Sequence, residues 1–151
     1  MKEKIEICGF GRVQLVNHKT GRIEGDSGWK RNAITEVGFQ DYLVALVGAT
    51  TGSKQATVLA LASQTAAGNS TQTSLTGEFG GRKTASRAIV SSQTLRMTGN
   101  WATDEANQSE LGAIGAYNTT TGGSVMNALT YATSQKTTDQ QLNATLEFRF
   151  S

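Results

Sequence analysis

The chain has 151 residues, with 14 basic and 12 acidic side chains, one His, one Cys and no Pro. This length predicts a single domain over residues 1–151. The net charge of +2 is too small to indicate a nucleic-acid-binding protein by composition alone. One Cys and one His exclude an internal disulfide and a His-rich metal site.

The N-terminal residues lack the apolar core of a secretory signal. No stretch approaches the roughly 18–20 apolar residues that cross a bilayer. We therefore expect no membrane partner, and synthesis in a reducing cytoplasm where Cys8 remains a thiol.

Apolar and polar residues alternate near the N-terminus, as they do in strands with one buried face. Ile5 and Ile7 begin this pattern, and the polar, glycine-containing stretch 17–22 predicts a hairpin turn. We expect two or three strands over residues 4–31. Residues 1–7 are predicted to form an arm that adds a strand to a neighbouring protein.

One segment has the pattern of an amphipathic helix. Thr35 can cap its start and Gly48 can end it. Five apolar residues share one face at helical spacing: Phe39, Tyr42, Leu43, Leu46 and Val47. We expect a helix over residues 36–47 whose apolar face packs into the core.

The remainder of the chain is predicted to form strands joined by polar turns. Apolar, small or alternating residues predict strands at 58–62, 85–101, 110–117, 126–132 and 141–150. Residues 75–83 predict a connecting turn. The whole pattern predicts a mainly β fold, an antiparallel β-sandwich or jelly-roll-like barrel with one amphipathic helix.

The sequence contains no constellation that indicates catalysis. His18 lies in a polar turn, and the carboxylates Asp104 and Glu105 lie in a polar loop without aromatic neighbours that would raise their pKa. Residues 77–84 resemble a phosphate-binding loop, but Arg82 stands where that motif requires glycine. We therefore expect no enzyme, no cofactor and no metal site.

Nucleic-acid binding and carbohydrate binding are two alternative functions for a β-rich domain of this composition. A nucleic-acid site would need a basic stripe formed by Lys30, Arg31, Arg82, Lys83, Arg87 and Arg96. Aromatic residues are few and do not interleave with these basic residues, so we expect no specific nucleic-acid partner. A carbohydrate-binding sandwich would need Trp29, Trp101 and Tyr117 to converge on one face.

The order of several short motifs resembles that of a known class of proteins. Residues 28–38, GWKRNAITEVG, lead directly into the predicted helix, and residues 75–78, LTGE, precede Arg82. Residues 110–112, ELG, follow, and a strand of alternating aromatics closes the chain. This layout resembles small tailed-bacteriophage virion proteins that are encoded among head and tail structural genes.

The resemblance implies a capsid decoration or cement protein. Its partner would be the major capsid protein, its location the capsid surface of the virion after synthesis in the host cytoplasm, and its oligomeric state a homo-trimer. A protein that binds only the assembled lattice stabilises the shell by mass action. The alternatives are a tail, baseplate or fibre-associated component and, from another class, the carbohydrate-binding module.

The motifs also predict local roles for individual residues. Asn32 and Thr35 are expected to bond free N–H groups where the chain enters the helix, and Gly38 completes this turn and cap. Arg82 and Glu110 are predicted either to form an ion pair between two loops or to remain two exposed charges. Finally, the residues predicted to contact a partner are Ile5, Ile7 and Trp29.

Overall fold

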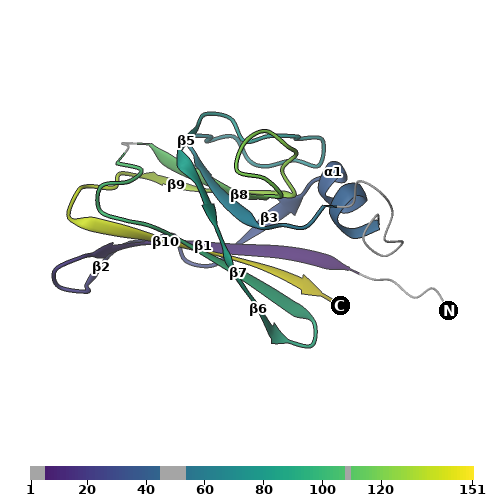
Figure 1. The fold of residues 1–151 in the computed structure, drawn as a ribbon, viewed down its shortest axis with the longest axis horizontal. Helices are drawn as coiled ribbons and strands as arrows, with labels where there is room; N and C mark the ends of the chain where they lie inside the picture. The colour runs from purple at the N-terminus through teal and green to yellow at the C-terminus, as the bar shows by residue number, and fades with distance from the viewer. Residues whose placement is uncertain (1–5, 45–53, 108–109) are drawn as a thin grey trace.

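The computed structural model describes residues 6–44, 54–107 and 110–151, which form antiparallel strands and one short helical segment (Figure 1). The strands are β1 (Ile7–Asn17), β2 (Ile23–Asp26), β3 (Lys30–Ile34), β4 (Val58–Ala62), β5 (Glu78–Thr84), β6 (Ser86–Ser91), β7 (Thr94–Trp101), β8 (Leu111–Tyr117), β9 (Asn127–Ser134) and β10 (Gln140–Phe150). The helical segment consists of α1 (Glu36–Gly38) and the π-helical turn η1 (Phe39–Val44). The prediction of a mainly β, antiparallel fold is confirmed.

The sheet is nearly closed into a barrel. Its path runs β5-β4-β8-β9-β3-β1-β10-β7-β6, and β2 pairs with β1 beside this path. The two end strands, β5 and β6, are consecutive in the chain and separated only by Ala85. One extended stretch therefore pairs with β4 in its first half and with β7 in its second. The indole Nε1 of Trp101 donates to the Gly81 carbonyl at 3.1 Å, and this bond links β7, next to one end of the sheet path, to β5 at the other end.

The longest pairing joins the two ends of the chain. β1 and β10 are antiparallel over their whole length, from the pair Ile7 and Phe150 to the pair Asn17 and Gln140. In β10 the alternating residues Leu142, Ala144, Leu146 and Phe148 are all buried in the main core. The alternation predicted for the final strand is therefore confirmed, since period two places every second side chain on one face.

A second, smaller core covers the outer face of β4 and β8. Val58, Ala60 and Ala113 lie there with Tyr117, packed against Leu75 of the neighbouring loop. The loops that follow β4 and β8 lie over this face (Figure 1). Every residue of both strands is buried, because the barrel interior covers one face and these loops cover the other.

Two predictions between residues 75 and 101 are wrong. Residues 75–83 do not form only a turn, because most of them belong to β5. Gly80 and Gly81 have φ of 73° and 69°, which a turn commonly requires, but here they form an irregularity inside the strand. Residues 85–101 form not one strand but the hairpin of β6 and β7.

The helix predicted over residues 36–47 begins where expected and is helical as far as Val44, but not as a regular α-helix. It is α-helical for one turn and then widens into η1, and residues 45–47 lie outside the described residues. Tyr42 is buried and Leu43 packs against the core, as expected, but half of the surface of Phe39 is exposed. The π-helical turn has more residues per turn than an α-helix, so side chains depart from the face that α-helical spacing predicts.

Candidate functional site

The start of the helix is organised by Thr35 and Gly38. The Thr35 hydroxyl accepts from the Gly38 amide at 2.8 Å and donates to the Val125 carbonyl at 2.7 Å. A Cβ on Gly38 would lie 2.2 Å from the Met126 carbonyl oxygen. Both residues therefore have a packing role: they hold the helical segment against the stretch that leads into β9.

Asn32 does not have the predicted role at the helix start. Its buried amide oxygen and nitrogen have no hydrogen-bond partner. The side chain lies against the backbone of Gly9, its partner in the pairing of β1 with β3. Strand β3 directs this side chain toward β1 and away from the first turn of the helix, which leaves the cap to Thr35 alone.

Arg82 pairs with Glu78 and not with Glu110. Its guanidinium makes two 3.0 Å bonds to the Glu78 carboxylate and also donates to the carbonyls of Thr119 and Gly122. It stacks over the Tyr117 ring at 3.5 Å from the centroid. Glu110 is exposed. For Glu110, the structure therefore agrees with the alternative prediction of an exposed charge. The glutamate of the LTGE motif is thus the partner of Arg82, because β5 places both on one strand.

The three predicted partner contacts have different environments. Ile5 lies outside the described residues. Ile7 already pairs with Phe150, and Glu6 and Ser151 exchange backbone hydrogen bonds. Residues 6 and 7 therefore belong to the protein's own sheet. For these two residues, the prediction of an N-terminal arm over residues 1–7 is wrong. Trp29 is 43% exposed, so it is accessible to a partner.

The aromatic cluster required by a carbohydrate-binding module is not present. Trp101 and Tyr117 are completely buried in two different cores, and of the three aromatics only Trp29 is exposed. Four of the six basic residues considered for nucleic-acid binding pair with carboxylates: Arg31 with Glu6, Arg82 with Glu78, Lys83 with Glu105, and Arg96 with Glu147.

The carboxylates with shifted pKa values are stabilised in their charged form. A hydrogen bond from Lys83 is the main cause that lowers the pKa of Glu105. Burial alone would raise the pKa of Glu147, but bonds from Arg149 and Arg96 outweigh it and hold the pKa below its ordinary value. A general acid at neutral pH needs the opposite shift, so both groups serve as structural ion-pair partners.

This ion-pair arrangement predicts an acid-dependent loss of stability. Because folding lowers the pKa of Glu147, its contribution is complete above the ordinary value of 4.5 and is lost as the pH falls through the lower folded value. We expect Glu147→Gln to lower the free energy of unfolding by about 2 kcal/mol at pH 7 and by less at pH 3. Urea unfolding at both pH values measures this, with the exposed Glu110→Gln as control. An equal cost at both pH values would contradict the assignment.

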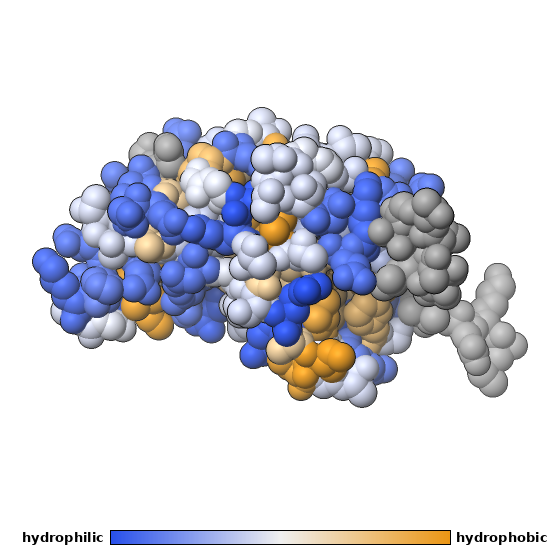
Figure 2. Space-filling model, viewed as in Figure 1, coloured by the Kyte–Doolittle hydropathy of each residue, from blue (hydrophilic) through white to orange (hydrophobic). Residues whose placement is uncertain are grey.

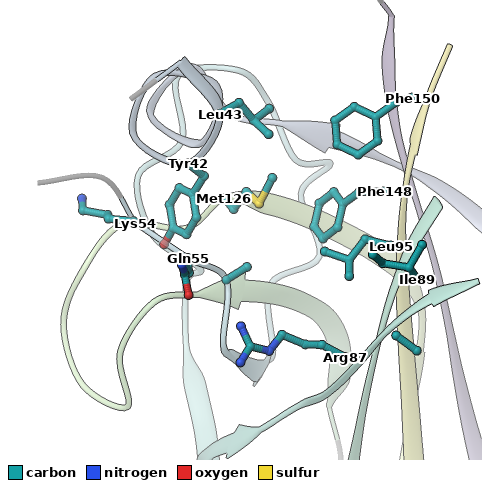
Figure 3. A pocket seen from close by; sticks show the side chains of 12 residues that line it. Tyr42, Leu43, Lys54, Gln55, Arg87, Ile89, Leu95, Met126, Phe148 and Phe150 are labelled. Carbon is teal, nitrogen blue, oxygen red and sulfur yellow. The ribbon is translucent and has the colours of Figure 1, made fainter. Parts of the chain in front are cut away.

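An open apolar surface lies where the helical segment faces β6 (Figure 3). A groove of about 480 Å³ lies between them. Its apolar lining consists of Tyr42, Leu43, Ala56, Ala88, Ile89, Leu95, Met126, Phe148 and Phe150. Ile89 and Val90 of β6 are 81% and 44% exposed, and the lower edge of the molecule in Figure 2 is hydrophobic where β6 lies.

The polar lining of this groove is predominantly basic. Lys54 is paired with Asp41 at 2.6 Å. Arg87 extends from β6 across the groove toward Gln55 (Figure 3). Within residues 6–44, 54–107 and 110–151, no carboxylate forms an ion pair with Arg87, so the groove has an unneutralised positive charge beside an apolar floor.

No protein-family model, curated protein or solved structure that was compared with this chain matches it. In the part that the structure describes, no helix has the length and apolar character to span a membrane, and no three His, Cys, Asp or Glu side chains are grouped as metal ligands.

The sequence predictions did not identify the groove. Its residues come from five separated parts of the chain: η1, the stretch before β4, the hairpin of β6 and β7, Met126 just before β9, and the end of β10. One local signal was present, since Ile89 and Val90 are adjacent apolar residues in a strand with six exposed positions. An apolar, exposed strand at the end of a sheet is a favourable surface for protein binding.

Proposed function

We propose that this protein is a structural virion component that binds and stabilises an assembled bacteriophage capsid, as a decoration protein does. The observation that supports it most is the apolar groove beside β6, whose lining residue Ile89 is 81% exposed. Apolar surface of this kind favours association with another protein. The order of the GWKRNAITEVG, LTGE and ELG motifs supports the virion class.

The mechanism is selective binding to the assembled shell. If the capsid site exists only where major capsid subunits meet, binding lowers the free energy of the assembled state and leaves free subunits unaffected. Apolar burial at the groove supplies much of the affinity. Trp29, which lies on a different part of the surface, is a second contact in this proposal.

The first test is the location of the chain in particles. Mass spectrometry of emptied heads and of detached tails is expected to find the chain in heads. Its presence in tails alone would support the tail or baseplate alternative, and its absence from purified particles would contradict a virion role.

A second test uses co-sedimentation with purified expanded capsids. We expect Ile89→Asp to weaken binding at least about tenfold, because a carboxylate would replace apolar contact at the groove. Ile23→Asp is the matched control, since Ile23 is also exposed, at 52%, but lies in β2 away from the groove. Equal binding by both variants and the unmodified protein would contradict the groove as the capsid-binding surface.

A further inference from the structure

Strand β6 has an unpaired edge. It is the last strand of the sheet path and pairs only with β7 among the described strands. All six of its residues are exposed. Because backbone N–H and C=O groups alternate in direction along a strand, those of β6 that point away from β7 are available to another chain.

The side chains beside this edge have a defined order. Arg87 and Ile89 are opposite Met97 and Leu95 of β7, so they lie on the side of the sheet that faces the core. Both line the groove. The groove side of β6 therefore presents a positive charge and, two residues later, an apolar side chain.

From this order we propose that the capsid protein adds an extended segment to the free edge of β6, and that this segment has an acidic residue and an apolar residue two positions apart. In a paired strand, the residues opposite Arg87 and Ile89 also lie on the groove side, because side chains two positions apart share a face. The carboxylate pairs with Arg87, and the apolar side chain enters the groove over Met126 and Phe148. This inference rests on the proposed function and specifies how the partner binds.

Charge and backbone geometry together favour an extended segment with an acidic residue at the edge of β6. Lys54 is neutralised by Asp41, whereas Arg87 has no carboxylate partner in the described part of the chain. A partner with only apolar side chains would leave the guanidinium without a counter-charge at a newly buried interface, which is unfavourable. A partner that is not extended would leave the edge groups of β6 unbonded.

Hydrogen–deuterium exchange on the complex with purified expanded capsids tests the strand addition. We expect exchange of the outward-pointing amides within residues 86–91 to slow about tenfold or more on binding. The amides of β2, an exposed strand away from the groove, serve as the internal control. Capsid binding without protection of β6 would overturn the strand addition and leave the proposed function intact. No binding to capsids would instead contradict the proposed function.

Charge reversal tests the acidic residue of the partner. We expect Arg87→Glu to weaken capsid co-sedimentation about tenfold, whereas the control Arg22→Glu, an exposed arginine outside the groove, retains binding. Equal affinity of Arg87→Glu and the unmodified protein would overturn the proposed pairing. Concentration-dependent protection of β6 in the protein alone would show that a second copy occupies the edge, and would likewise overturn the proposal.

Discussion

Gly38→Ala is expected to lower the free energy of unfolding by about 2–3 kcal/mol. The added Cβ would lie 2.2 Å from the Met126 carbonyl oxygen and 2.8 Å from its Cα. These are backbone atoms next to β9, so a side-chain rotation cannot relieve the overlap. The helical segment must move away from the barrel, which also weakens the cap that Thr35 provides through the Gly38 amide.

Urea unfolding at neutral pH measures this effect. Gln40→Ala is the matched control, because Gln40 is exposed in the adjoining η1. We expect its change to remain within about 0.5 kcal/mol. If Gly38→Ala were as stable as the control, the close contact between α1 and the stretch before β9 would be incorrect.

Arg82→Met is expected to destabilise the protein by about 3 kcal/mol. The arginine side chain is 9% exposed, and its loss would remove the guanidinium bonds to the Glu78 carboxylate and to the carbonyls of Thr119 and Gly122. Breaking a buried ion pair by removing one partner costs about 3–5 kcal/mol. We expect the lower end of this range because Glu78 is 27% exposed and regains some hydration.

A double-mutant cycle with Glu78→Gln separates the ion pair from the other contacts of Arg82. We expect a coupling free energy of about 1–2 kcal/mol, with the rest of the loss due to the carbonyl bonds and the stacking on Tyr117. The control Arg22→Met removes an exposed arginine and should change stability little. Additive effects of the two single variants would contradict a direct pair.

The predictable part of the fold was encoded in local periodicity. The last strand alternates between apolar core residues and polar residues, and this pattern alone located β10 to within one residue at its start. The hairpin between β1 and β2 follows in the same way from the polar turn at residues 17–22, where Asn17 accepts from and donates to neighbouring turn residues. Such elements are specified by residues adjacent in sequence.

The incorrect predictions concern places where distant residues decide the structure. The glycines at 80 and 81 resemble a turn, but pairing with β4 on one side and the Trp101 bond to Gly81 keep the segment in the sheet. Asn32 resembles a cap residue, but the register of β3 against Gly9 of β1 directs its side chain elsewhere. Tertiary pairing outweighed local preference in both cases.

The candidate site also contains some features that the local sequence specifies and others that depend on distant residues. Thr35 and Gly38 were identifiable from their spacing at a helix start. The groove was not, because it exists only when η1 and the end of β10 lie beside β6. The sequence shows that Ile89 and Val90 are adjacent apolar residues, but only the structure shows that both are exposed and that their strand ends the sheet path.

Cryo-electron microscopy of purified particles tests most directly whether this chain binds the capsid shell through β6. At side-chain resolution, the reconstruction is expected to place this chain on the outside of the capsid shell, with β6 facing the major capsid protein and density filling the groove between Arg87 and Met126. A chain bound to the shell through another face, with β6 exposed to solvent, would contradict the binding surface. A map of the intact particle without this chain on its shell would contradict the account as a whole.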